Sequence, residues 1–454
     1  MARPSDDVLR RIAEFTLSRP AEAFPEEVLA RAALLLLDTL GVAAAAAPME
    51  AARIARETAV ALFGAGPTGM GARLLFDGRG VSVAGAAFAG ATQIDNLDGH
   101  DGYSPTKGHI GVAAVPALAA LAAGAPDLTG PEALATLVVG YEIAGRAGIA
   151  LHASVSDYHT SGAWNALGVA AMAARMRRMS PEQLRQALGI AEYHGPRSQM
   201  MREIANPTML HDGSGWGALA GMTAAVLAEA GFTGAPAVTV EASDAAAHWA
   251  DLGDFWQSLH QYVKPYPVCR WAHAAIDAAE ELAERHGFVP EEIAEIRIGS
   301  FDNAVALYPG MPETTSQAQY SLPFAVASRL VHGRLGLAEI EGEALGDPRT
   351  ARLVSLTRMQ AEPRHEARYP EGRWADVAIE LTGGRILHSG DVHARGGPER
   401  PMADAEVVAK FDAYARPVLG RARADGLRDA VLALPGAGSR FADVARHLHD
   451  PVRV

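Results

Sequence analysis

Mostly apolar segments, separated by Gly, Pro and Asp, follow one another over the first 260 residues. Apolar positions recur at helical spacing in these segments or fill them almost completely, as in helices that are buried on several sides. We therefore expect a large all-helical domain. The predicted helices lie within residues 33–46, 85–97, 112–123, 131–151, 165–179, 181–194 and 217–231.

The pattern changes after Lys264. A helical segment at 272–287 precedes alternating apolar and polar positions at 291–301, and a second alternating stretch at 374–392 is interrupted by Gly383 and Gly384. Alternation indicates strands, and a Gly-Gly pair between two alternating segments indicates a hairpin. With a further helix at 321–336, these elements predict a smaller α+β unit.

The fold class expected from these patterns is mainly α, in two domains. A chain of 454 residues exceeds the roughly 250 to 300 residues at which single cores usually stop growing. We assign residues 1–264 and 399–454 to the helical domain, because the segment from Pro401 onward is helical again. Residues 265–398 form the predicted α+β domain.

Composition limits the classes of binding partner and the cell compartments that we expect for this protein. The net charge of −13 disfavours a nucleic acid or an anionic membrane as partner, although it permits a local basic pocket for a small anion. No secretory signal is apparent, and the most apolar stretches are interrupted before they reach the ~20 residues needed to span a bilayer. The only cysteine, Cys269, excludes an internal disulfide and a cluster held by several cysteines. We expect a cytoplasmic protein.

The segment from Ile94 to Gly111 is the first candidate functional site. It runs directly into the apolar helix predicted at 112–123. Catalytic groups concentrate on loops that are held by rigid scaffolds, so this dense set of charges favours a functional role over a simple connection. The charged side chains of the loop are Asp95, Asp98, His100, Asp101, Lys107 and His109.

Three other loops place a basic or imidazole side chain before a long apolar helix, at His159, His211 and Lys264. The first turn of a helix presents unpaired N–H groups and a positive dipole end, which can bind an anion. Together with His109, these loops suggest a site for a small polycarboxylate. Ordinary helix capping by residues such as Thr160 is the alternative for any one of them.

Other chemistries find little support in the sequence. There is no phosphate-binding GxxxxGK[ST] loop, no GxGxxG after a strand, and no HExxH. The oxygen and imidazole groups from Asp95 to Asp101 could bind a divalent ion, but their spacing matches no ligand pattern, and we predict no metal. Cys269 lies beside Arg270, which could lower the pKa of its thiol, although a lone buried cysteine is usually inert.

Acid–base chemistry by histidine and lysine remains. Removal of a proton alpha to a carboxylate needs a base and stabilisation of the charge that grows on the carboxylate oxygens. Histidine suits the base near neutral pH. Lys264 lies in an apolar, aromatic setting where desolvation favours pairing with a substrate anion.

Several segments resemble the MmgE/PrpD family, which includes 2-methylcitrate dehydratase, cis-aconitate decarboxylase and iminodisuccinate epimerase. KPYPVCRWAHAAIDAA at 264–279 is similar to the family's KPYPxCRxxHxxIDA. AQYSLPFAVASRLVHG at 318–333 resembles AQFSLPYxVAxxLxxG, and RPMADAEVVAKF at 400–411 resembles PMxxxELxxKF. With DYHTSGAWNALGVAAMAAR at 157–175 and the segment from Ile94 to Gly111, which we call the Asp-rich loop, the resemblance spans nearly the whole chain.

The resemblance implies a large helical domain with an α+β lid, an active site in the cleft between them, and a homodimer. It also implies catalysis without a metal or organic cofactor. The family's functional positions match Asp95, His109, His159, Lys264 and Tyr320 in this sequence.

Three departures from the family pattern concern the site. The family's DxDD tract reads DNLDGHD at 95–101, and its HP dipeptide reads His109-Ile110. A lysine that many members carry in a KxLHxG segment is replaced in TMLHDG, at Thr208 or His211. A cation for one substrate carboxylate is therefore missing at this position.

The function we expect is that of a cofactor-independent lyase of the dehydratase type, acting on a small hydroxy di- or tricarboxylate. His109 or His159 would move the alpha proton, with Asp95 orienting an imidazole, and Tyr320 would donate to the leaving hydroxyl. Lys264 would hold a carboxylate. The expected substrate-binding residues are Asp98, His100, Lys107, Thr160, His211 and Arg270.

Three alternatives remain open from the sequence. An epimerase or isomerase would return the proton to the opposite face. A decarboxylase would release carbon dioxide from an acid such as cis-aconitate. A non-catalytic carboxylate-binding protein would bind the acid without forming a product.

Overall fold

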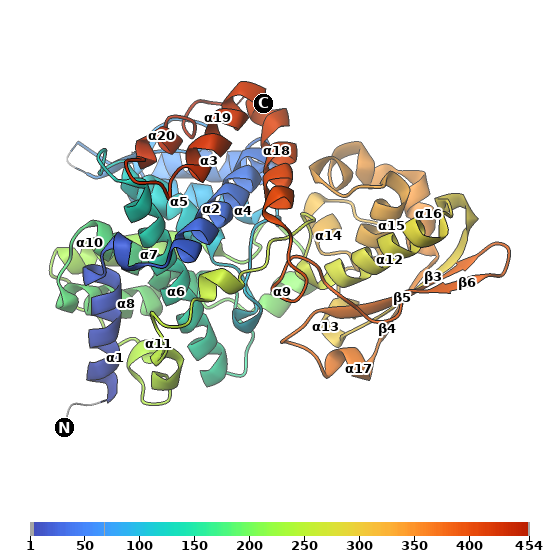
Figure 1. Ribbon diagram of the computed structural model, residues 1–454, viewed down its shortest axis with the longest axis horizontal. Coiled ribbons are helices and arrows are strands. Elements are labelled where there is room, and N and C mark those ends of the chain that lie inside the picture. Colours follow the sequence, from blue (N-terminus) through green and yellow to red (C-terminus); the bar gives the residue numbers. More distant parts are fainter. Residues whose placement is uncertain (1–3, 68, 453–454) are drawn as a thin grey trace.

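The computed structural model describes residues 4–67 and 69–452 and consists of a large helical part and a smaller α+β part beside it (Figure 1). The seven predicted helices of the large part are confirmed. A short antiparallel ribbon, β1 (Gly71–Arg73) with β2 (Gly80–Ser82), interrupts the helical pattern. The helices are α1 (Pro4–Ala13), α2 (Glu26–Ala46), α3 (Glu50–Leu62), α4 (Val83–Asp95), α5 (Gly111–Ala122), α6 (Gly130–Ser154), α7 (Gly162–Met176), α8 (Pro181–His194), α9 (Met200–Ala205), α10 (Ser214–Glu229) and α11 (Val238–Glu241).

Small residues allow the central helices to pack closely. A Cβ on Gly168 of α7 would lie 2.7 Å from the carbonyl oxygen of Gly140 in α6, so only glycine fits at this crossing. A Cβ on Gly217 of α10 would lie 2.7 Å from the Cα of Gly162 at the start of α7. These approaches fix the N-termini of α7 and α10 beside each other, and the loops that enter them therefore converge.

The smaller part is built around a five-stranded mixed sheet. Strand β3 (Ile293–Ser300) pairs in parallel with β4 (Thr357–Ala361) and antiparallel with β5 (Trp374–Leu381). The predicted hairpin is confirmed, because β5 pairs antiparallel with β6 (Ile386–His388) across Gly383 and Gly384. Strand β7 (Val392–His393) also pairs with β5, and α12 (His273–His286) contacts β5. The other helices are α13 (Asp302–Val305), α14 (Thr315–Gln319), α15 (Leu322–His332), α16 (Pro348–Ser355) and α17 (Pro363–Glu366).

The C-terminal segment returns to the large part as α18 (Asp404–Leu419), α19 (Arg421–Leu432) and α20 (Phe441–Ala445). Helix α18 packs against α2 (Figure 1). The contact includes a buried ion pair of 2.6 Å between Lys410 Nζ and Asp38 Oδ1. Lys410 Nζ also donates to the carbonyl oxygen of Gly99 at 2.6 Å, so the C-terminal segment holds the loop at 94–111 in place.

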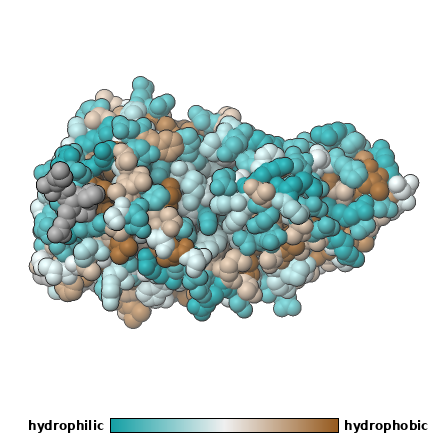
Figure 2. Space-filling view, turned by 90° about the horizontal axis from the view of Figure 1, so that it is seen from below, coloured by the Kyte–Doolittle hydropathy of each residue, from teal (hydrophilic) through white to brown (hydrophobic). Residues whose placement is uncertain are grey.

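Two helices, α2 and α6, are long and apolar enough to cross a membrane by length and composition. In the most apolar stretch of α2, 83% is buried inside the fold, and in that of α6 94% is buried, as in core helices. The face seen in Figure 2 carries mainly hydrophilic residues with small separate apolar groups, and no continuous apolar band crosses it. We therefore interpret both helices as core elements.

Candidate active site

A small cavity lies where the two parts of the protein meet. Its volume of about 20 Å³ is enough for a single water molecule. Side chains from both parts line it, and most of them are charged or aromatic. The lining residues are Asp98, Lys107, His109, Tyr158, Met200, Asp212, Tyr262, Lys264, Cys269, Arg270, Trp271, Tyr320 and Arg373.

Lys264 is completely buried in this wall and is held by the Asp-rich loop. Its ammonium group donates to the carbonyl oxygen of Asp98 at 3.0 Å and to the carboxylate of the same residue. Asp98 adopts a left-handed backbone conformation with φ of 55°. Burial raises the pKa of the Asp98 carboxyl to about 6, while the positive charge of Lys264 opposes the shift. At neutral pH the two groups form a buried ion pair.

His109 presents an unprotonated nitrogen to the same cavity. Its Nδ1 lies 2.6 Å from the carbonyl oxygen of Asp101, and because a carbonyl only accepts, the hydrogen-bond network assigns the proton to Nδ1. Nε2 therefore carries the lone pair, 3.6 Å from Oδ2 of Asp212. Burial, together with the positive charge of Lys264, lowers the pKa of His109 to about 4. A neutral imidazole with this orientation can accept a proton from a bound acid.

Asp101 fixes the carbonyl that sets the tautomer of His109. The Asp101 carboxylate accepts hydrogen bonds from the Tyr141 hydroxyl and from the backbone N–H of Gly111, the first residue of α5. Burial raises the pKa of Asp101 to about 7, against the effect of the Tyr141 hydrogen bond. Asp101 and Tyr141 therefore position His109 through the backbone and do not contact the cavity.

Replacement of Tyr141 by Phe tests this positioning role. We expect kcat to fall about tenfold with little change in KM, because one charge-assisted hydrogen bond that fixes the Asp101 backbone is lost. Histidine ¹⁵N NMR should show a smaller Nδ1–H population for His109 in the variant. A variant with wild-type kcat and an unchanged His109 tautomer would contradict the role.

Asp95 and His100 lie behind the cavity and not in its wall. Asp95 ends α4, and its Oδ2 accepts from the backbone N–H of Ser214, the first residue of α10, at 3.1 Å. Its Oδ1 lies 3.6 Å from Nε2 of His100, whose ring is edge-on to His109 at 4.5 Å. Burial, and then the charge of Asp212, raise the pKa of Asp95 well above its usual value. The imidazole that Asp95 contacts is therefore His100.

Only some of the remaining predicted residues lie in the cavity wall. Lys107, Arg270 and Tyr320 line the cavity with His109 and Lys264, but His159 does not. Its backbone N–H donates to Nε2 of His152 at 3.2 Å, and its buried Nδ1 has no partner among residues 4–67 and 69–452. Thr160 and His211 line a second hollow of about 430 Å³ together with residues of α9, and the ring of His211 lies 5.5 Å from that of Tyr320 in the cavity wall. The geometry thus favours His109 over His159 as the base.

Two family models match this chain. The model described as the MmgE/PrpD N-terminal domain matches residues 10–257, and the model described as the MmgE/PrpD C-terminal domain matches residues 266–435. Together they cover nearly the whole chain. This chain belongs to the MmgE/PrpD family. A comparison with curated proteins gives no match.

Membership in the MmgE/PrpD family identifies the chain as an enzyme of a family that contains dehydratases, decarboxylases and epimerases. The two matched regions meet between residues 257 and 266. Lys264 lies in this junction, at the cavity between the two parts. The family resemblance seen in the sequence is confirmed over both regions.

Sequence reasoning missed Tyr158, Asp212, Tyr262 and Arg373 among the polar residues in the cavity of this MmgE/PrpD enzyme. Asp212 accepts from the N–H of Ser161 at 3.0 Å and from its hydroxyl at 2.8 Å, and it faces His109. It follows His211 in a loop that enters a helix, so the signal that selected His211 could have found it. Tyr262 and Arg373 also line the cavity, with the ring of Tyr262 edge-on to that of His109 at 6.2 Å, and no motif marks them.

A reactive cysteine and a metal site in the Asp-rich loop were the two other chemistries that the sequence offered. Burial raises the pKa of the Cys269 thiol to about 12, so this cysteine is protonated and unreactive, although it lines the cavity. The Asp95 to Asp101 segment does not fit a metal ion, because its three carboxylates already bind Lys264, Tyr141 or helix N-termini.

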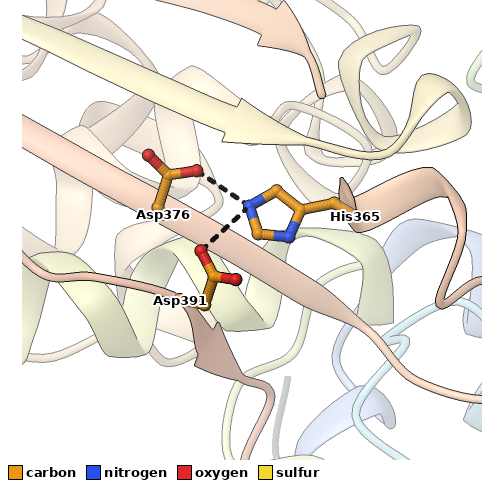
Figure 3. Close-up of side chains that lie close together, drawn as sticks. All are labelled: His365, Asp376 and Asp391. Carbon is orange, nitrogen blue, oxygen red and sulfur yellow. Dashed lines mark hydrogen bonds and ion pairs between the residues drawn. The ribbon is translucent and has the colours of Figure 1, made fainter. Parts of the chain in front are cut away.

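A second titratable cluster lies in the α+β part of this MmgE/PrpD protein. In Figure 3, the carboxylates of Asp376 and Asp391 both approach Nε2 of His365, at 2.8 and 3.8 Å. Arg364 pairs with both carboxylates, and Arg368 pairs with Asp391 at 2.7 Å. The guanidinium groups already pair with the carboxylates that a metal ion would need as ligands. We therefore interpret the cluster as an ion-pair network that joins α17 to the sheet.

Proposed function

We propose that this protein is a cofactor-independent lyase of the dehydratase type that acts on a small hydroxy polycarboxylate. The observation that carries the proposal is the unprotonated Nε2 of His109 in a cavity lined by Lys107, Lys264 and Arg270. A base beside cationic side chains suits removal of a proton alpha to a carboxylate.

The reaction would proceed by transfer of the alpha proton to Nε2 of His109. The negative charge that develops on the adjacent carboxylate would be stabilised by Lys264 and Arg270. The electron pair then forms the carbon–carbon double bond as the bond to the hydroxyl group breaks. Tyr320 would give its proton to the departing hydroxide to form water and would regain a proton from His109 through solvent. Burial raises the pKa of Tyr320 well above its usual value and keeps it protonated as a donor.

Substrate entry would require the α+β part to move. The cavity has room for about one water molecule, whereas a dicarboxylate is several times larger. We therefore propose that the structure corresponds to a closed arrangement and that the α+β part acts as a lid.

A screen of small acids tests the proposed reaction. Citrate, methylcitrate, aconitate, malate and aspartate-derived acids are incubated with the enzyme and followed by NMR. Loss of water from a hydroxy acid supports the lyase. If deuterium enters the substrate with inverted configuration and no water is lost, the enzyme is an epimerase. Release of carbon dioxide would indicate a decarboxylase. Thermal stabilisation without a product would indicate a binding protein.

We propose a cytoplasmic location, which the single buried thiol supports.

We also propose that the protein is a homodimer that uses the face formed by α8 and α10. Of the 15 exposed large hydrophobic residues in the described chain, eight lie between Tyr193 and Val238. Trp216 is 57% exposed and borders an apolar groove of about 310 Å³ that Ile190 and Leu227 also line. Concentration of exposed apolar side chains on one region marks an interaction surface.

Replacement of Trp216 by Asp should convert the dimer to a monomer. A buried Trp at the centre of an interface contributes at least about 2 kcal/mol, so the dissociation constant should rise more than about 30-fold. Sedimentation velocity provides the measurement. Replacement of Leu62, a 70% exposed residue of α3, by Asp is the matched control and should leave the dimer intact. A dimeric Trp216→Asp variant would show that this face is not the interface.

A further inference from the structure

Two guanidinium groups are buried in the cavity wall without a carboxylate partner. Arg270 and Arg373 are 6% and 4% exposed, and neither forms an ion pair with any residue of the described chain. Arg270 donates to the backbone carbonyls of Ala394, at 2.9 Å, and Arg395. Arg373 donates to the carbonyl of Pro370.

Buried charges without counterions are costly. An uncompensated charge in the interior costs several kcal/mol, and arginine does not escape the cost by losing its proton. Burial lowers the pKa of Arg270 to about 10, which still leaves the group charged at neutral pH. The cost is offset if an anion enters the cavity that both groups line.

The net charge of the cavity wall indicates how many negative charges a ligand needs to neutralise it. Lys107, Lys264, Arg270 and Arg373 are cationic, whereas Asp98 and Asp212 are the carboxylates. Asp98 neutralises Lys264, and Asp212 is engaged by Ser161. With His109 neutral, the wall carries an excess of two positive charges.

Both arginines are held in place before any ligand arrives. The guanidinium of Arg270 lies over the ring of Tyr262, 4.5 Å from its centroid, and that of Arg373 lies over the ring of Tyr369 at 4.8 Å. Their other hydrogen bonds are to backbone carbonyls of the α+β part and, for Arg270, to Nδ1 of His273 at 3.4 Å. Because the side chains are already ordered, binding a carboxylate costs little additional entropy.

We propose that the residues of this wall, once the α+β part has moved to admit the ligand, bind a dicarboxylate dianion, with one carboxylate on Arg270 and Arg373 and the other beside Lys107 and Lys264. The inference rests on the proposed function and narrows its substrate class from di- or tricarboxylates to dicarboxylates. Arg373 becomes a substrate-binding residue. A third carboxylate would meet the wall of Asp98 and Asp212 without a free cation.

The test measures the affinity of the full-length protein for three probes of increasing charge by calorimetry at neutral pH. Succinate should bind at least about tenfold more tightly than butyrate, which has one carboxylate, and than tricarballylate, which has three. Arg373→Gln should weaken succinate binding at least about tenfold, to near the affinity of the wild-type protein for butyrate. Arg373→Lys retains the charge and should recover part of the affinity.

Arg368→Gln is the matched control, because Arg368 belongs to the same segment, pairs with Asp391 and does not line the cavity. It should leave all three affinities unchanged. Tighter binding of tricarballylate than of succinate, or unchanged succinate binding in a folded Arg373→Gln variant, would overturn the inference but leave acid–base catalysis at His109 intact. Failure of the wild-type protein to bind any of the three acids would overturn both the inference and the proposed substrate class.

Discussion

Replacement of His109 by Gln lowers kcat by about 10²- to 10⁴-fold if His109 is the general base. Glutamine is close to histidine in size and remains polar, but it has no nitrogen that can take a proton near neutral pH. Its effect on KM should be small, because the cationic groups of the wall remain. Steady-state kinetics on the acid identified by the screen provides the measurement.

The matched control replaces His159 by Gln. His159 does not line the cavity, so this variant should keep kcat within about tenfold of wild type. A larger loss at His159 than at His109 would exchange the roles of the two histidines.

The pH dependence of kcat/KM provides an independent check on the same residue. The active form of a base is unprotonated, and burial lowers the pKa of His109 to about 4. The proton is therefore lost well below neutral pH, and the fall in kcat/KM that belongs to His109 should lie below about pH 5. Falls between pH 7 and pH 5 belong to Asp101 and Asp98, whose pKa values are raised to about 7 and about 6. A profile without a fall below pH 5 would contradict the assignment of the base to His109.

Replacement of Lys264 by Met has the second largest expected effect, because it removes a substrate cation and leaves the buried carboxylate of Asp98 unpaired. Breaking one partner of a buried ion pair typically costs about 3–5 kcal/mol of unfolding free energy. Thermal and denaturant unfolding should show this loss. We also expect kcat/KM to fall at least about 10²-fold.

The double variant Lys264→Met/Asp98→Asn separates the two effects. Without the unpaired charge, most of the lost unfolding free energy should return, since replacement of both partners of a buried pair is often close to neutral. Activity should not return, because the cation is still absent. A stable and active Lys264→Met variant would remove Lys264 from the mechanism.

The sequence was sufficient to predict the long apolar helices and the hairpin, but not shorter or more polar helices such as α3 and α16. Apolar stretches such as 33–46 and 217–231 are long enough to form only buried helices, and Gly383 and Gly384 mark the turn between β5 and β6. Strand β4 was not predicted, because Thr357–Ala361 lies at the sheet edge, is mostly exposed and lacks apolar alternation. Its pairing with β3 depends on the fold around it.

The candidate site was predicted only in part. His109 and Lys264 stood out because each lies before a helix, and the helices bring them into one cavity. His159 has the same local pattern but does not face the cavity, since the direction of a side chain depends on packing. Arg373 lies 109 residues beyond Lys264 in a segment rich in arginine, so only the structure distinguishes it from its paired neighbours.

Deuterium exchange at the alpha carbon is the most direct test of proton abstraction by His109. The acid identified by the screen is incubated in D₂O with the wild-type enzyme or with His109→Gln, and deuterium at the alpha carbon is followed by NMR. The account predicts exchange by the wild-type enzyme and a rate at least about 10²-fold lower in the variant, at equal occupancy by the acid. Exchange by His109→Gln at the wild-type rate would contradict it.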